Sequence, residues 1–305
     1  MYRFIVQRIL QSLLTVLAVS IVVFLFMQIA GDPAALLVSE DASPADVAAL
    51  RSRLGLDRPV YVQYFDFMEE LLTNGKELKS FRYYQPLMPL LLQGLERTLA
   101  LAVGAVIIAI VLALPLGTLA ALRRGSMLDI IIRIFAVFGQ SMPSFWVAML
   151  LVLFFAVRFP IFPVAGLGVK NAVLPMATLT FYQLAVLLRL FRSEVLEVIH
   201  QDYVRTARSK GLREIAIVIR HVFKNAGLPV LTMVGLQLSG LILSAVVVEP
   251  IFAWPGLGYL MVDSVLMRDY PVVVGGAIVA GIFVTATNLI IDILYGVVDP
   301  RIRYA

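Results

Sequence analysis

The residues best suited to chemistry in this sequence are its two histidines, and their placement favours neither metal binding nor catalysis. His200 and His221 lie in one basic stretch and do not stand three or four residues apart, as two ligands on one helix would. Cysteine is absent, which excludes disulfides, thiolate metal sites and cysteine nucleophiles and leaves the redox compartment undetermined. No Ser-His-Asp order with a G-x-S-x-G elbow occurs. We therefore expect no catalytic residue, no metal site and no bound cofactor.

The sequence also lacks a nucleotide-binding motif. Gly75-Lys76 has no earlier glycine at the spacing of a phosphate-binding loop, and no Ser or Thr follows the lysine. The glycine pairs at 166/168 and 256/258 lack the third glycine and the strand of a dinucleotide site, so we interpret them as loop turns. If the chain takes part in ATP-driven work, ATP and Mg must be bound by another chain.

The composition predicts that lipid surrounds much of the chain. Of the 305 residues, 61% are hydrophobic and 15% are charged, whereas soluble domains contain about a quarter charged residues. We predict an all-α membrane protein with six transmembrane helices. The predicted spans are 1–30, Leu95–Leu122, Ile131–Ala156, Ala172–Leu190, Val230–Glu249 and Val272–Val298. The net charge of +5 is interpreted through its placement around the membrane and not as a sign of nucleic-acid binding.

Charge placement predicts the topology. Arg3 and Arg8 precede the first apolar run, which is too long for a signal peptide. In short loops, Lys and Arg are in excess on the side of both termini, so we expect N- and C-termini in the cytoplasm and the chain in the inner (plasma) membrane. Asp292, a lone carboxylate near the inner end of the last span, is expected to cap a helix, form a pair or face the bundle.

Three segments follow from this topology: an N-terminal helix (1–30), an external loop (31–94) and a five-helix core (95–305). In the external loop, Ser43 is a predicted N-cap before Pro44 and Asp46, Gly55 ends that helix, and a second short helix is expected near Val60 to Leu72. The core holds a cytoplasmic loop at 192–228 and an external segment at 250–271.

The cytoplasmic loop contains the most informative stretch, 202–229. We predict Asp202 as an N-cap, two helical turns over Tyr203 to Lys210, and a stop at Gly211 with positive φ. A second helix should then bury one face, and Pro229 should open the next span. That face comprises Leu212, Ile215, Ile219, Phe223 and Ala226. A short helix followed by an amphipathic one suits docking to a soluble partner, although a basic cytoplasmic loop without further function has the same charge pattern.

The external segment 250–271 combines interfacial aromatic residues with a short apolar-sided helix. A re-entrant or surface helix fits this pattern, and an ordinary external loop is the alternative. Charged residues beside apolar spans pair or line water, so we predict a solute pathway at the outer mouth. Its candidate residues are Glu249, Trp254, Asp263, Arg268 and Asp269. Arg268 and Asp269 could instead only fix the loop.

Several separated motifs resemble the permease subunits of ABC importers of the dipeptide/oligopeptide/nickel subfamily. They are Gly31-Asp32-Pro33, LGLDRPVYVQY (54–64), SMPSFW (141–146), FPIFPVAG (159–166), TARSKG (206–211), RHVFKNAGLP (220–229), PIFAWPGLG (250–258), DSVLMRDYPVV (263–273) and DILYGVVDPRIRY (292–304). Two departures stand out. Thr206-Ala207-Arg208 replaces the general Glu-Ala-Ala, as in the peptide subfamily, and GKELKSF (75–81) replaces a GDLGxSF-like segment.

The resemblance implies a type I importer fold in membrane lipid and a set of protein partners. These partners are a second homologous permease, two ATPase subunits that bind ATP and Mg, and an external binding protein. It also implies ATPase coupling through Asp202, Tyr203, Val204, Arg205, Thr206, Ala207, Arg208, Lys210 and Gly211. We expect the side chains at 203, 204 and 207 to be the buried contacts, and the cations at 205, 208 and 210 to pair with acidic groups of the ATPase.

Two other classes of function remain open. A channel or secondary transporter acting alone would need ion-coupling acids inside spans or paired broken helices, and neither is evident. A membrane scaffold or receptor subunit without transport is the other class. The solute could be a dipeptide, an oligopeptide, a nickel chelate, glutathione or a sugar.

Overall fold

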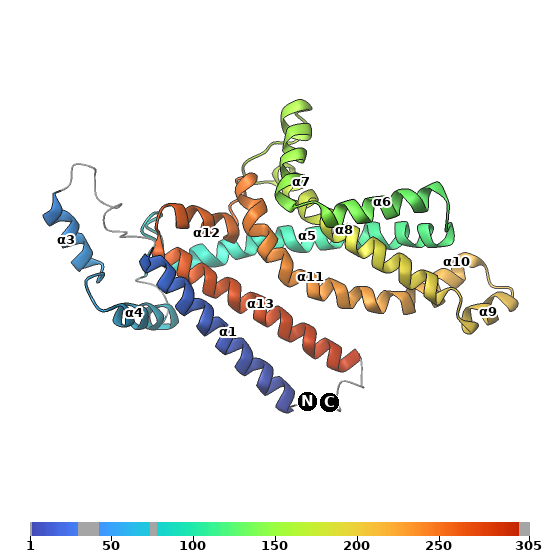
Figure 1. The fold of residues 1–305 in the computed structure, drawn as a ribbon, viewed down its shortest axis with the longest axis horizontal. Coiled ribbons are helices and arrows are strands. Elements are labelled where there is room, and N and C mark those ends of the chain that lie inside the picture. Colours follow the sequence, from blue (N-terminus) through green and yellow to red (C-terminus); the bar gives the residue numbers. More distant parts are fainter. Residues whose placement is uncertain (1, 30–42, 74–77, 299–305) are drawn as a thin grey trace. The chain divides into compact units, whose positions relative to one another are not determined.

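The computed structural model describes residues 2–29, 43–73 and 78–298, and its regular elements there are all helices (Figure 1). They are α1 (Tyr2–Ile29), α3 (Pro44–Arg53), α4 (Val60–Thr73), α5 (Leu87–Leu122), α6 (Met127–Ser141), α7 (Ser144–Val152), the π-helical η1 (Leu153–Arg158), α8 (Val169–Val198), α9 (Asp202–Ser209), α10 (Glu214–Ile217), the π-helical η2 (Val218–Val222), α11 (Phe223–Ile251), α12 (Leu257–Leu266) and α13 (Tyr270–Val298). The motif at 31–33, residues 299–304 of the last motif and residues 75–77 of the departure at 75–81 lie outside the described residues.

The helices confirm an all-α membrane fold. Five are long and apolar enough to cross a bilayer: α1, α5, α8, α11 and α13. The pair α6 and α7–η1 makes a sixth span if the two are counted together. Pro115 and Pro229 both lie inside helices, α5 and α11. Pro229 opens the apolar span Pro229–Ile251, as predicted, but it does not lie in the first turn of its helix, because α11 already begins at Phe223 and runs through the proline.

The third predicted span is not one straight helix. α6 ends at Ser141, and the chain turns by 108° before α7 begins at Ser144 (Figure 1). Met142 is extended, with φ −82° and ψ 126°, as expected for a residue that precedes proline. Pro143 is the N-cap of α7. The sequence Met142-Pro143 therefore breaks the span that was predicted to run uninterrupted over Ile131–Ala156.

The chain divides into two compact units. Unit 1 comprises Met1–Thr98 and Pro255–Ile293, and unit 2 comprises Leu99–Trp254 together with the C-terminal residues. The segments predicted from the sequence assigned α12 and α13 to the five-helix core (95–305), whereas in the structure both helices belong to the same compact unit as the N-terminal segments. Each unit is therefore built around its own hydrophobic clusters.

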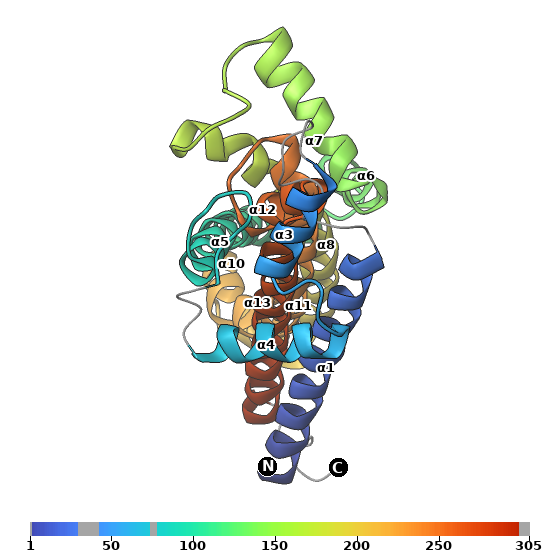
Figure 2. The ribbon, with the colours of Figure 1, turned by 90° about the vertical axis from the view of Figure 1, so that its left-hand side faces the viewer.

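In unit 1, α1 lies beside α13, and side-chain contacts are found near both ends of α1. Near one end, Arg8 Nε lies 3.1 Å from Asp292 Oδ2, so the lone carboxylate of the last span forms a pair. Near the other end, Phe24 stacks edge-on against Tyr64, with 5.3 Å between the ring centroids. Tyr64 belongs to α4, which lies crosswise to the two long helices (Figure 2).

The predicted capped helix is present between α1 and α5. Ser43 and Asp46 form a reciprocal capping box at the start of α3, and Gly55 follows the helix with φ +68°. The Asp46 carboxylate accepts from the Ser43 hydroxyl and backbone, which lowers the pKa of Asp46. α4 occupies the predicted position of the second helix.

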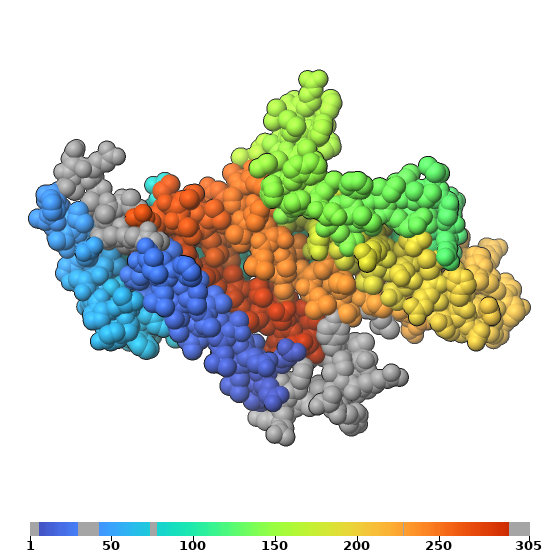
Figure 3. All heavy atoms as spheres, in the orientation of Figure 1, coloured from blue at the N-terminus to red at the C-terminus, as the bar shows by residue number. Residues whose placement is uncertain are grey.

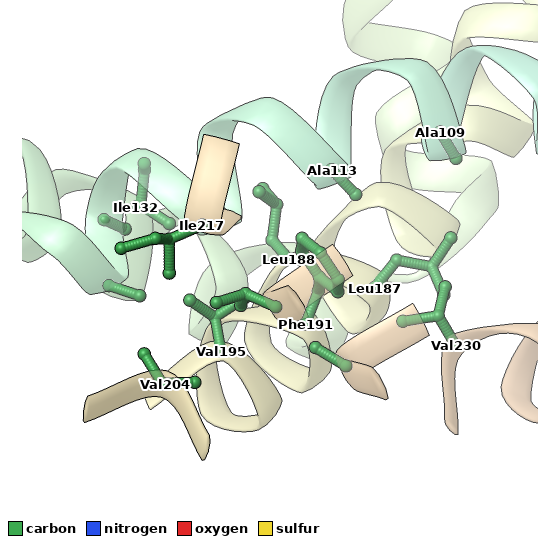
Figure 4. Packing of buried hydrophobic residues seen from close by; sticks show 14 of the residues in the cluster. Ala109, Ala113, Ile132, Leu187, Leu188, Phe191, Val195, Val204, Ile217 and Val230 are labelled. Carbon is green, nitrogen blue, oxygen red and sulfur yellow. The ribbon is translucent and has the colours of Figure 1, made fainter. Parts of the chain in front are cut away.

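Unit 2 is built around α8, which packs against α6, α7 and α11. Gly139 of α6 permits a close approach to α8, because a Cβ at this position would lie 2.5 Å from the Cβ of Ala185. Two hydrophobic clusters run along α8. One surrounds Phe191 (Figure 4), and the other surrounds Leu174 and Phe252. The first of these clusters also holds α9, as described below.

Candidate functional site

The α9 helix begins one residue earlier than predicted. Gln201 is the N-cap, with extended backbone and no side-chain cap hydrogen bond, and Asp202 is the first helical residue. The prediction that Asp202 caps the helix was therefore wrong. Its carboxylate still suits the first turn, where it faces the positive end of the helix dipole, and its Oδ1 lies 3.8 Å from Arg205 Nη1.

The end of α9 matches the prediction. Lys210 is the C-cap and Gly211 has φ +75°. The Gly211 N–H donates to the Arg208 carbonyl at 2.9 Å, and the Leu212 N–H donates to the Ala207 carbonyl at 3.4 Å. This pair of bonds is a Schellman motif, which needs a left-handed residue at the position of Gly211. α9 is therefore a helix of two turns with a defined end.

One face of α9 is buried within this chain. Val204 is 0% exposed and Ala207 is 5% exposed, and both join the cluster around Phe191 and Val195 (Figure 4). The expectation that these two residues form contacts with a partner was wrong, because they anchor α9 to its own unit. Tyr203 is 42% exposed, and its hydroxyl accepts from Asn225 Nδ2 at 2.9 Å.

The opposite face of α9 is exposed and polar. Residues three, four and seven apart share one face of a helix, and this spacing places Asp202, Arg205, Thr206 and Ser209 together. The hydroxyls of Thr206 and Ser209 donate to carbonyls one turn earlier, at 2.9 Å each. The segment from α9 to α10 forms one end of unit 2 (Figure 3). We call these four residues the outer face of α9.

A bidentate ion pair ties α9 to α10. Arg208 Nε and Nη2 donate to the two carboxylate oxygens of Glu214 at 2.7 and 3.3 Å. The hydrogen bond from Arg208 lowers the pKa of Glu214, and the same bond raises the pKa of Arg208. Arg208 was expected to pair with an ATPase, but in this chain its guanidinium is already paired. Arg205 and Lys210 are exposed cations of the segment.

The second helix of the loop buries only the later part of the predicted face, where Ala226 is 0% exposed and Phe223 stacks edge-on against Phe191. Ile215 is 75% exposed and Ile219 is 63% exposed, whereas Ile217 and Val222 are fully buried. The π-helical turn η2 at Val218–Val222 adds a residue to the turn, so the uniform helical spacing used for the prediction does not hold across it.

The pathway residues predicted in unit 1 mainly hold a loop. Buried Asp269 accepts from the Ser80 hydroxyl and from the backbone N–H groups of Phe81 and Arg82, the latter two at 3.2 and 3.1 Å. Arg268 precedes it with φ +53°. These contacts favour the alternative that Asp269 fixes the loop.

Asp263 of α12 is bonded in the same way. It accepts from the Tyr83 hydroxyl at 2.8 Å. Burial and then this hydrogen bond raise the pKa of Tyr83. The other two predicted residues, Glu249 and Trp254, belong to unit 2 and are 0% and 7% exposed. The Trp254 N–H donates to the Glu249 carbonyl at 2.9 Å, which turns the chain at the end of α11.

The sequence did not predict a hollow at the break between α6 and α7, which is lined by both polar and apolar side chains. It has a volume of about 240 Å³ and lies among α7, α8 and α11. Its lining is Met142, Pro143, Ser144, Thr178, Leu179, Tyr182, Gln183, Leu241 and Ser244. Polar side chains at membrane depth face protein or water, and discontinuous helices often form solute sites in transporters. The Met142-Pro143 pair was the available signal for the break.

Two glutamines near this hollow differ in their contacts. Gln183 is 4% exposed and lines the hollow. Gln140, at the end of α6, donates to the Ala136 carbonyl at 2.9 Å and is not part of the lining. The hollow therefore presents hydroxyl and amide groups among apolar side chains, without a carboxylate or a cation in its lining.

Comparison with known proteins matches the whole chain to one group. Residues 113–304 match the family described as binding-protein-dependent transport system inner membrane component, and residues 1–102 match its N-terminal region. The chain is 41% identical over 314 residues to a putative peptide transport system permease protein of Brucella abortus, with all of both chains covered.

Two further relatives cover the whole of this chain. The chain is 36% identical to the oligopeptide transport system permease protein AppB of Bacillus subtilis, covering 100% of that protein. It is 35% identical to the dipeptide transport system permease protein DppB of Escherichia coli, covering 99% of that protein. A crystal structure of an amino acid ABC transporter with histidines has the same fold, with a TM-score of 0.52 at 17% identity over 68% of this chain and 92% of the other.

Proposed function

The chain belongs to the family of binding-protein-dependent transport system inner membrane components and is a multi-pass permease subunit of an ABC importer, and we propose how it works within that importer. It pairs with a second homologous permease, and two ATPase subunits bind ATP and Mg and drive the pair. An external binding protein delivers the solute. Both termini and α9 face the cytoplasm, in keeping with the excess of Lys and Arg in the short loops on that side.

We propose that α9 transmits the ATPase movement to the membrane helices. The supporting observation is that α9 has one buried and one exposed face. Val204 and Ala207 are buried in the cluster around Phe191 of α8, and the outer face of α9 is exposed. A force applied to the outer face would reach α8 through close-packed side chains, which deform little. Two turns with a defined stop make α9 a rigid contact element for the ATPase.

The solute is proposed to be a peptide or a similar small molecule. The relatives described above are named as permeases for peptides, oligopeptides and dipeptides, at 41%, 36% and 35% identity. The hollow at the α6–α7 break offers hydroxyl and amide groups, which suit the neutral amide groups of a peptide backbone. We propose that this hollow is the contribution of this subunit to the solute pathway.

Purification of the complex from native membranes tests the subunit composition. Two ATPases and a second permease should co-purify. In liposomes containing the complex and the binding protein, ATP should drive uptake of di- or oligopeptides. Transport by the chain without an ATPase would favour a secondary transporter, and a chain that assembles but moves no solute would favour a scaffold.

Arg205→Glu tests the contact through α9. Reversal of this exposed charge should weaken association with the ATPases and lower uptake by roughly tenfold, because like charges meet at the contact. Lys170→Glu is the matched control. Lys170 is also an exposed cation, but it lies at the start of α8, whereas α9 follows the other end of this helix, which is about 45 Å long. Equal effects of both variants, or none from Arg205→Glu, would contradict docking through the outer face.

A further inference from the structure

Two adjoining hollows in unit 2 lie between α6 and α8 and have no part in the function proposed above. The first, of about 380 Å³, is lined by Arg124, Gly125, Asp129, Arg133, Arg192 and Leu196. The second, of about 290 Å³, is lined by Ile132, Arg133, Ala136, Val137, Arg189 and Arg192. Arg133 and Arg192 line both, so the hollows are neighbours. The first is the basic hollow and the second the apolar hollow.

A buried carboxylate organises the basic hollow. Asp129 is 1% exposed and accepts from Arg192 Nε and Nη2 at 2.6 and 3.1 Å. The Gly125 N–H also donates to this carboxylate, at 3.0 Å. These three donors satisfy Asp129, because a carboxylate in this setting is stabilised by a bidentate guanidinium and a backbone donor. Arg192 is thereby fixed in place between α6 and α8.

The remaining arginines keep most of their positive charge unneutralised. Arg133 Nε lies 3.6 Å from Asp129 Oδ2, which is too long for a strong hydrogen bond, and its side chain is 54% exposed. Within the described residues, Arg124 and Arg189 are exposed and form no ion pair. One carboxylate therefore faces four guanidinium groups across the two hollows. A ligand that occupies this region must be an anion.

The apolar hollow indicates what kind of anion fits. Its floor is formed by Ile132 and Ala136, which are 6% and 2% exposed, and Val137 forms an exposed wall. Val137 lies eight residues from Asp129 on α6, about 12 Å along the helix and away from the end where α6 begins. Guanidinium groups at the rim and an apolar groove farther along the span match a phosphate head with acyl chains.

We propose that the two hollows together bind one anionic phospholipid. Its phosphate lies where the two hollows meet at Arg133, with Arg124 on the side of the basic hollow and Arg189 on the side of the apolar hollow, and an acyl chain follows Ile132, Ala136 and Val137. Basic pockets between transmembrane helices on the cytoplasmic side attract anionic headgroups. The general preference for cations in cytoplasmic loops explains why there are many arginines here. It does not explain why they surround a basic hollow that adjoins an apolar one.

Native mass spectrometry of the purified full complex tests this proposal. The complex is exposed to mixed micelles with phosphatidylglycerol or with phosphatidylcholine, and the bound lipid is counted. Phosphatidylglycerol should be retained and phosphatidylcholine lost. Arg133→Gln and Arg189→Gln should each lower retention about fivefold, and the double variant about 25-fold. Arg133→Lys should retain the lipid because it keeps the charge.

Controls separate this site from its alternatives. Arg123→Gln removes an exposed arginine of the same turn that lines neither hollow, and it should not change retention. Equal loss in this control would mean general surface attraction and would overturn the proposal. Displacement by inorganic phosphate or glycerophosphoglycerol, which lack acyl chains, would reveal a site for a free anion. Unchanged lipid retention with loss of the ATPase subunits in the double variant would show that the arginines bind protein.

Discussion

Gly211 offers the sharpest test of whether a rigid end on α9 matters for coupling. Its φ is +75°, and no atom lies within 4 Å of the position that a Cβ would occupy. A side chain at Gly211 would therefore meet no obstacle, and the cost comes from the backbone alone. For a residue with a Cβ this cost is about 1–2 kcal/mol in the left-handed region, with β-branched residues at the upper end. Asparagine tolerates this conformation better than other residues with a side chain.

The expected effect of Gly211→Val follows from that cost. A penalty of 1–2 kcal/mol changes a local equilibrium by about 5–30-fold. The amides of Gly211 and Leu212, which close the Schellman motif, should exchange with deuterium faster by this factor. In liposomes containing the whole importer, ATP hydrolysis should continue while solute uptake per ATP falls. Gly211→Asn should lie close to the wild type in both measurements.

Gly55 supplies the matched control. It has φ +68°, with only the flexible side chain of Arg58 at 4.0 Å from the position of a Cβ, and it follows α3 in unit 1. Gly55→Val imposes the same kind of backbone strain away from α9 and should leave uptake per ATP unchanged. Wild-type amide exchange and wild-type coupling in Gly211→Val would refute a role for the rigid end of α9. Uncoupling of transport to the same degree by Gly55→Val would refute it equally.

Three further outcomes can be measured. Asp269→Ala should release the loop that Asp269 holds at Ser80 and lower stability by roughly 3 kcal/mol, because buried donors are left without an acceptor. Limited proteolysis should then cleave the chain within residues 78–86, and an uncut loop would contradict this. The hydrogen bond from Arg208 lowers the pKa of Glu214, so the ion pair should persist from neutral pH down to about pH 5 and weaken only below the ordinary glutamate pKa of about 4.3. Amide hydrogen exchange of α10, corrected for the intrinsic rate, should therefore be constant over pH 5–7, and faster exchange within this range would count against the ion pair. Gln183→Leu should lower peptide uptake by about tenfold through loss of a hydrogen bond to the solute, whereas Gln140→Leu should have little effect. A larger loss of uptake in Gln140→Leu than in Gln183→Leu would contradict a solute pathway through this hollow.

Features that depend on neighbouring residues were predictable from the sequence. Ser43, Pro44 and Asp46 have the spacing of a capping box, and the structure contains one. Gly211 stands where a short helix needs a left-handed residue, and it has that conformation. Apolar length alone located the long spans, because a bilayer requires about 20 residues to cross it.

The errors arose where distant segments decide the outcome. Val204 and Ala207 were assigned to a partner because their burial against α8 cannot be inferred from α9 alone. Asp129 and Arg192 are 63 residues apart, and Ser80 and Asp269 are 189 apart, so no local pattern joins them. A π-helical turn also cannot be recognised from spacing, because the rule that assigns faces assumes a uniform helix.

The ion pair between Arg8 and Asp292 has a consequence for biosynthesis. The two residues stand near opposite ends of the sequence, and unit 1 is assembled from Met1–Thr98 and Pro255–Ile293. Chains emerge from the ribosome N-terminus first, so the contact between Arg8 of the first helix and Asp292 can form only when the last helix arrives. Apart from the C-terminal residues, unit 2 is the continuous segment Leu99–Trp254, whose helices can pack during that delay. Unit 1 needs Pro255–Ile293 for its packing, so a chain terminated before this segment would lack the core of unit 1 but keep most of unit 2.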